Sequence, residues 1–218
     1  MTLTDSIIND IKPVSEKENI GEVQSIFTQT TYSHVPIERD GVYVGSLPEN
    51  DTHCLDADTP ISEYSHGYEH FFVRFETNWL DVLEAFAQNG CNLMPVLGEN
   101  NQYLGYYELE DVMNFFNNTP FISEPGSVVV IEKGVQDYSF SEISQIVESN
   151  DGKLWGMFIS KIENDVAEIS LKIGRSNFND ILAAFRRYSY IIVSSHQEDT
   201  FLTDLRARSQ YLEKYLNI

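Results

Sequence analysis

Two aspartates, Asp51 and Asp111, are carboxylates that stand at matching places in two similar segments. Each lies six positions after a glycine, in the segments GSLPEND at 45–51 and GYYELED at 105–111. A carboxylate in the first turn of a helix can accept hydrogen bonds from ligand hydroxyls. The helix macrodipole also favours a negative charge there without any ligand, so a binding role and a purely structural role both stay open.

A second group of reactive side chains lies between residues 53 and 70. Its members are His53, Cys54, Glu63, His66, Glu69 and His70, which are of types that bind metals. Gly67 would weaken a helix that presented both nearby histidines on one face, and a solvated linker explains the group more simply. We predict no metal site. Cys91, with no histidine nearby in the sequence, is expected to be a buried apolar side chain.

Composition and charge exclude several classes of partner. The 218 residues include 14 Lys and Arg against 34 Asp and Glu, a net charge of −20. Nucleic acids and anionic membranes are bound by clustered basic side chains, so we expect neither as a partner. No apolar run is long enough to span a bilayer and no leader-like segment opens the chain, which favours a cytoplasmic protein. No nucleophile–base motif or phosphate-binding glycine loop occurs, so we predict no enzymatic activity and no catalytic residues.

An internal repeat places the two aspartates in equivalent positions. The pairs that an offset of 59 residues relates are Val14 and Val73, Val23 and Val82, Phe27 and Phe86, and Val35-Pro36 and Met94-Pro95. One inserted residue later, Gly45 aligns with Gly105 and Asp51 with Asp111. The copies span about 11–55 and 71–116, and each reads as strand, helix, strand, hairpin, strand and helix.

Local signals support these elements. Asn19 and Asn78 precede the apolar helical patterns and are predicted N-caps, and Asp40-Gly41 is a hairpin turn signal. One copy alone would leave an apolar sheet face uncovered. We therefore expect the copies to pack about an approximate twofold axis and to leave clefts in which small ligands bind.

The repeat resembles a pair of CBS domains, a Bateman module, over about residues 1–118. The resemblance implies that a cleft between the copies binds an adenosine-containing ligand and that the aspartates bind ribose hydroxyls. The ligand-binding residues that it implies are Asp51, Asp111, Val14, Val35, Pro36, Val73, Met94 and Pro95. No other cofactor is implied.

The sequence departs from the family pattern at the hydroxyl residue three positions before each aspartate. Pro48 and Glu108 stand there instead of Ser or Thr. Proline offers no donor, and glutamate would repel a phosphate at close range. A neutral nucleoside, a cationic ligand or no ligand fits this chemistry better than a nucleotide.

The second half is a different unit, separated by a predicted linker at 119–124. Strand signals at 127–131, 154–159, 167–173 and 190–193 alternate with helical signals after Ser139 and over 178–185, which is the β-α-β-β-α-β order. This half resembles an ACT domain over about 125–195, which implies an effector loop and association in dimers. The loop residues are Gly134, Asp137 and Tyr138. A stripe predicts a terminal helix in the 125–218 unit, formed by Leu202, Leu205, Ser209, Leu212 and Leu216.

The predicted fold class is therefore mixed α/β, with tandem CBS-type repeats followed by a ferredoxin-like ACT-type domain and a C-terminal helix. This arrangement is similar to that of acetoin-utilisation-type CBS proteins. Our hypothesis is a non-catalytic regulatory homodimer that senses a small molecule. The alternative is an interaction module, also a homodimer, that binds no ligand.

Overall fold

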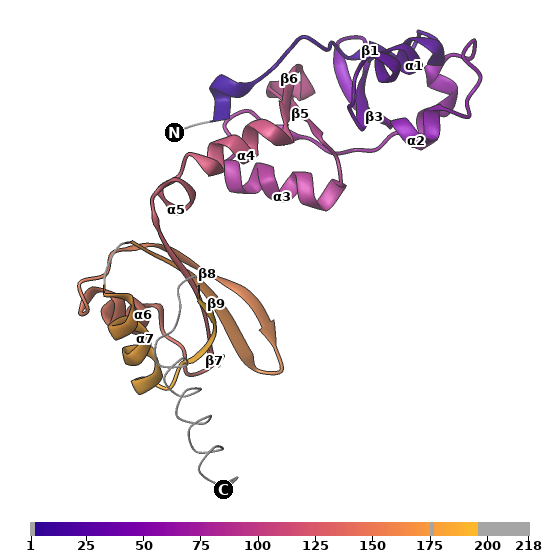
Figure 1. The fold of residues 1–218 in the computed structure, drawn as a ribbon. Coiled ribbons are helices and arrows are strands. Elements are labelled where there is room, and N and C mark those ends of the chain that lie inside the picture. The colour runs from indigo at the N-terminus through magenta and orange to yellow at the C-terminus, as the bar shows by residue number, and fades with distance from the viewer. Residues whose placement is uncertain (1–2, 175–176, 196–218) are drawn as a thin grey trace, which may run out of the picture. The chain divides into compact units, whose positions relative to one another are not determined.

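The computed structural model describes residues 3–174 and 177–195 (Figure 1). The chain divides into two compact units, Met1–Asn117 and Asn118–Ile218. Each unit has its own sheets and its own core, and each is described by itself.

The first unit contains two three-stranded sheets of identical topology. The first copy consists of β1 (Val14–Ser15), α1 (Ile20–Gln29), β2 (His34–Arg39), β3 (Val42–Pro48) and α2 (Glu49–Thr52). The second copy consists of β4 (Val73–Arg74), α3 (Trp79–Asn89), β5 (Leu93–Leu97), β6 (Tyr103–Glu108) and α4 (Leu109–Asn117). In each copy the first strand is parallel to the second, and the second forms an antiparallel hairpin with the third. The predicted tandem repeat is confirmed. The described part of the unit, from residue 3 on, also contains the 3-10 helices η1 (Leu3–Ser6), η2 (Ile61–Gly67) and η3 (Glu99–Asn101).

The repeated apolar positions form the cores of the two copies. Val23 and Val82 are both fully buried, and each packs in a cluster with the strands of its own copy. Asp40 and Gly41 have φ values of 51° and 84°, as a tight hairpin requires.

The two predicted N-caps behave differently. The Asn78 side chain accepts a hydrogen bond from Leu80 N at 2.9 Å. Asn19 stands at the N-cap of α1 but makes no side-chain cap bond, so the prediction of a capping side chain is wrong there. The reason is that Ile20 N and Gly21 N donate to the backbone carbonyls of Thr59 and Ala57 instead, which already satisfies the first amides of the helix.

Each copy is joined to the segment that precedes the other copy. Ile8, ahead of β1, exchanges two backbone hydrogen bonds with Tyr106 of β6, at 3.0 and 2.8 Å. Glu69, ahead of β4, exchanges two with Ser46 of β3, at 2.8 and 2.9 Å. The equivalent bridges interlock the copies.

The two repeated glycines allow these bridges to form. Gly45 and Gly105 have φ values of 151° and 149°, in the region that favours glycine. A Cβ on Gly105 would lie 2.3 Å from the Ile8 carbonyl oxygen. The glycine of the repeat is therefore required by the close approach of a neighbouring backbone.

We predict that Gly105→Ala lowers the free energy of unfolding of the first unit by at least about 2 kcal/mol, because it adds backbone strain and a clash. Gly67→Ala is the control, since a Cβ there meets nothing within 4 Å. Urea unfolding followed by Trp79 fluorescence, in a Trp155→Phe background, measures the effect in this unit. Equal stability of the two alanine variants would contradict the account.

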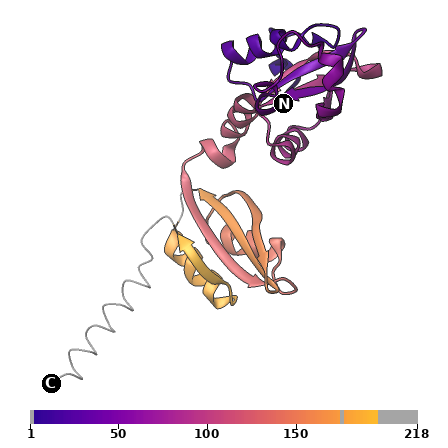
Figure 2. The same ribbon diagram turned by 90° about the vertical axis from the view of Figure 1, so that its right-hand side faces the viewer.

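The second unit is a four-stranded antiparallel sheet with two helices on one face (Figures 1 and 2). Its elements are α5 (Pro120–Ser123), β7 (Gly126–Gly134), α6 (Phe140–Glu148), β8 (Leu154–Glu163), β9 (Val166–Gly174), α7 (Phe178–Arg187) and β10 (Ile191–Ser195). The strand order β10-β7-β9-β8 is that of the split β-α-β fold. The predicted ferredoxin-like arrangement is confirmed.

The structure adds two local details to this unit. The strand predicted at 127–131 is buried on one face only: Val129 is fully buried, but Val128 is 41% exposed, because α6 and α7 cover only one face of the sheet. The segment predicted as a linker contains the short helix α5, whose Phe121 ring lies edge-on to the Phe158 ring in β8, with 5.8 Å between the ring centroids. The leucine stripe at 202–216 lies outside the described residues.

Candidate functional site

Residues related by the repeat hydrogen-bond to each other where the two copies meet. Ser33 N donates to Asn92 Oδ1 at 2.8 Å, and Asn92 N donates to Ser33 Oγ at 3.0 Å. Ser33 and Asn92 differ by the repeat offset of 59 residues. A reciprocal bond between equivalent residues requires an approximate twofold relation between the copies. We call this pair the Ser33–Asn92 seam.

The seam also positions the helices that carry the two aspartates. The Ser33 carbonyl accepts from Glu49 N at 2.9 Å, and the Asn92 carbonyl accepts from Leu109 N at 3.1 Å. Glu49 and Leu109 are the first residues of α2 and α4. The first turns of both helices are therefore fixed relative to the contact between the copies.

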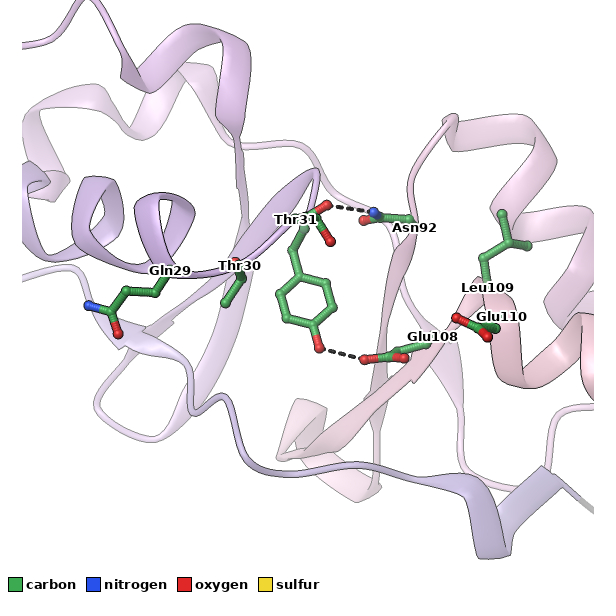
Figure 3. Close-up of a pocket in the computed structure, with 8 residues that line it drawn as sticks. Gln29, Thr30, Thr31, Asn92, Glu108, Leu109 and Glu110 are labelled. Carbon is green, nitrogen blue, oxygen red and sulfur yellow. Dashed lines mark hydrogen bonds between the residues drawn. The ribbon is translucent and has the colours of Figure 1, made fainter.

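A cavity of 420 Å³ opens beside the seam (Figure 3). This volume lies within the range of small-molecule sites. Both copies contribute to it, and the residues that line it are Gln29, Thr30, Thr31, Tyr32, Asn92, Glu108, Leu109 and Glu110. Two carboxylates and no Lys or Arg stand among these residues, so the cavity is electronegative.

A row of four hydrogen-bonding side chains runs from this cavity to the N-terminal segment. Tyr32 Oη donates to Glu108 Oε1 at 2.5 Å, a bond drawn in Figure 3, and lies 2.9 Å from Tyr106 Oη. Tyr106 Oη in turn donates to Asp10. Burial raises the pKa of both tyrosines, so both hydroxyls keep their protons near neutral pH. We call these four residues the tyrosine row.

The predicted aspartates lie at the expected places in the two helices. Asp111 is half-buried in the first turn of α4, directly after the lining residue Glu110. Burial, and then repulsion by Glu108 and Glu110, raises the pKa of Asp111. Asp51 is exposed in α2. Neither aspartate lines the cavity of 420 Å³.

The six apolar residues of the predicted site lie in strands and are buried within the two copies. They are Val14, Val35, Pro36, Val73, Met94 and Pro95, and none of them lines this cavity.

Sequence reasoning missed Tyr32 and Asn92 as lining residues. The repeat offset could have identified Asn92, since it is the counterpart of Ser33. Tyr32 aligns with Cys91, so no repeated pattern marks it.

The seam continues into a buried histidine on the first copy. His34 Nδ1 lies 2.8 Å from Ser33 Oγ, and His34 Nε2 lies 3.1 Å from Glu69 Oε2. A carboxylate only accepts, so Nε2 carries the proton and neutral Nδ1 accepts from the Ser33 hydroxyl. Burial lowers the pKa of His34, and Glu69 opposes this shift in part. The counterpart of His34 in the second copy is Leu93.

The remaining reactive side chains are dispersed. Cys91 is buried, as predicted, and burial raises the pKa of its thiol to about 12, which keeps it protonated. Across residues 3–174 and 177–195, no group of three or more His, Cys, Asp or Glu side chains is placed to hold a metal ion. None of the described helices is long and apolar enough to cross a membrane.

The predicted effector loop of the second unit borders a cavity of 490 Å³. Gly134 and Asp137 line it, and the other lining residues are Glu132, Lys133, Val166, Tyr188, Ser189 and Ile191. Tyr138 lies outside the lining and packs against the core of the unit.

We predict that the first unit loses stability as the pH falls below about 6.5 because of His34. A lowered folded-state pKa means that the unfolded chain binds this proton more tightly, so acid favours unfolding and higher pH does not. His34→Leu should show a smaller loss of unfolding free energy between pH 7 and pH 5 than wild type, measured by urea unfolding with Trp79 fluorescence. His66→Leu, at an exposed histidine, is the control and should retain the wild-type dependence. An unchanged pH dependence in His34→Leu would contradict this assignment.

Known proteins resemble part of this chain. No curated protein matches the chain. A CBS domain pair/ACT domain protein from Thermotoga maritima is 22% identical with a TM-score of 0.48, covering 53% of this chain and 96% of that chain. The CBS domains of a transcriptional regulator from Streptococcus pneumoniae are 19% identical with a TM-score of 0.47, and the match covers 52% of this chain and 98% of that chain. CBSX2 in complex with AMP is 16% identical with a TM-score of 0.43, and the match covers 53% of this chain and 95% of that chain. Residues 68–118, which span the second copy, match the family model of the CBS domain.

Proposed function

We propose that the first unit is a pair of CBS domains that senses a small molecule in the cavity beside the Ser33–Asn92 seam, and that the chain is regulatory and not catalytic. The observation that carries this proposal is that residues of both copies line the cavity, Thr30 to Tyr32 from the first and Glu108 to Glu110 from the second. A ligand that touches both copies can favour one relative packing over another, in proportion to its difference in affinity for the two.

The ligand is proposed to be adenosine-containing, with its hydroxyls bound by Asp111 and, in an equivalent cleft, by Asp51. The family match over 68–118 supports this assignment, and so does the place of Asp111 in the first turn of α4. The apolar strand residues of the predicted site, Val14, Val35, Pro36, Val73, Met94 and Pro95, would then support the cleft from the cores.

The second unit is proposed to act as an ACT-like module in a cytoplasmic homodimer. Its strand order supports this, and so does the cavity beside Gly134 and Asp137. Small effectors are proposed to bind at this loop, with Tyr138 behind it.

One observation favours the alternative of an interaction module without a ligand. In the tyrosine row, which reaches the cavity at Tyr32 and Glu108, each carboxylate accepts a hydrogen bond from a tyrosine hydroxyl, and Pro48 is buried at the position of the first copy equivalent to Glu108. A cavity that partly satisfies its own polar groups can persist empty.

We predict that at least one compound in a panel of adenosine, AMP, ATP, S-adenosylmethionine and amino acids raises the Tm of the full chain. At about 100 times its Kd, a ligand adds about 2.7 kcal/mol of stability. Asp111→Asn should weaken binding of the responding compound by about tenfold, because a neutral amide is a weaker acceptor for hydroxyls. Thermal shift and calorimetry measure both effects.

The matched control is Asp81→Asn, which changes an exposed aspartate in the first turn of α3 and should bind like wild type. If no compound shifts the Tm, the interaction module is the correct function. Equal affinities of Asp111→Asn and wild type would remove Asp111 from the site.

A further inference from the structure

The tyrosine row holds fewer protons than it has contacts. Asp10, Tyr106, Tyr32 and Glu108 form three successive oxygen–oxygen contacts. Each hydroxyl supplies one proton, and an ionised carboxylate supplies none. Three hydrogen bonds need three protons, and the row has two. It is therefore short of one donor.

The contact that lacks a proton is the one between the two tyrosine hydroxyls. Tyr106 donates to Asp10 and Tyr32 donates to Glu108, so neither proton is left for the contact of 2.9 Å between the hydroxyls. An unmade hydrogen bond between partly buried polar groups costs free energy. A ligand N–H that replaced the Tyr32 hydroxyl as the donor to Glu108 would free the Tyr32 proton for a hydrogen bond to Tyr106.

A ligand in the cavity could present such a donor to Glu108. Glu108 belongs both to the row and to the cavity lining, and Glu110 adds a second carboxylate to that lining. A phosphate group would face these two charges without a Lys or Arg among the lining residues to offset them. A cation would be attracted by both carboxylates.

We propose, building on the proposed function of this cavity, that it selects a ligand with a cationic N–H group, an ammonium or an amidinium, that donates to Glu108, and that it excludes phosphate. Glu108 thus determines specificity. Glu108 stands where the family pattern has Ser or Thr. In this proposal it is the residue that favours an amine-bearing ligand over a phosphate-bearing one.

The test compares three probes that share an adenosine and differ in charge: AMP, adenosine and 5′-amino-5′-deoxyadenosine. Agmatine tests the cationic group without a nucleoside. Calorimetry on the full chain at low salt should give the amino compound a Kd at least about tenfold lower than that of adenosine, with AMP weaker than either, because charge-assisted hydrogen bonds are the stronger ones. Glu108→Gln should reduce the preference for the amino compound to within about threefold, and Glu22→Gln, at an exposed residue of α1, should retain it.

The outcomes separate this inference from the proposed function. If AMP binds as tightly as the amino compound, the inference is wrong and the sensing function stands. If agmatine binds and the nucleosides do not, the inference stands and the adenosine assignment is wrong. If none of these probes binds, the inference is wrong, and the ATP, S-adenosylmethionine and amino-acid arms of the earlier panel decide the sensing function. The unliganded Glu108→Gln variant should be at least as stable as wild type, because its amide supplies a donor; a Tm lower by more than about 4 °C would contradict the donor count.

Discussion

The reciprocal hydrogen bonds between Ser33 and Asn92 are the contact on which the arrangement of the first unit depends. Each residue uses its backbone amide and its side chain toward the other, and each carbonyl then accepts the first amide of a helix, at Glu49 or Leu109. One pair of equivalent residues thus sets the relation between the copies and the direction of both helices that carry the aspartates. The cavity beside the seam exists because two surfaces are held together at this pair.

The two sides of the seam are alike in backbone and different in chemistry. On one side Tyr32 and Glu108 meet beside the cavity; on the other, their counterparts are Cys91 and Pro48, which cannot form such a bond. His34 extends the first copy's side of the seam to Glu69. The two sides therefore share their backbone pairing and differ in their polar groups, and the electronegative cavity lies on the side that carries Tyr32 and Glu108.

The sequence predicted the fold wherever a pattern repeats with a physical cause. The glycines at 45 and 105 recur because a neighbouring backbone passes close to each of them, and the aspartates recur in the first turn of the helix that follows each bridged strand. The sequence did not predict the lining of the cavity, because Tyr32 belongs to a connecting segment whose counterpart has another residue type. The prediction that the Asn19 side chain caps its helix was wrong for a similar reason. Capping propensity is a local property, and here the carbonyls of residues 57 and 59 accept the first helix amides instead of the side chain.

Hydrogen exchange at the backbone amide of Ser33 tests the seam most directly, because this amide, which precedes β2, donates across to the other copy. The account predicts strong protection in wild type, fast exchange in Asn92→Ala, and recovered protection in Asn92→Asp, which keeps the acceptor oxygen. The amide of Ile37, inside β2, should stay protected in all three proteins. Fast exchange of Ser33 in wild type, or protection unchanged by Asn92→Ala, would contradict the pairing of the two copies.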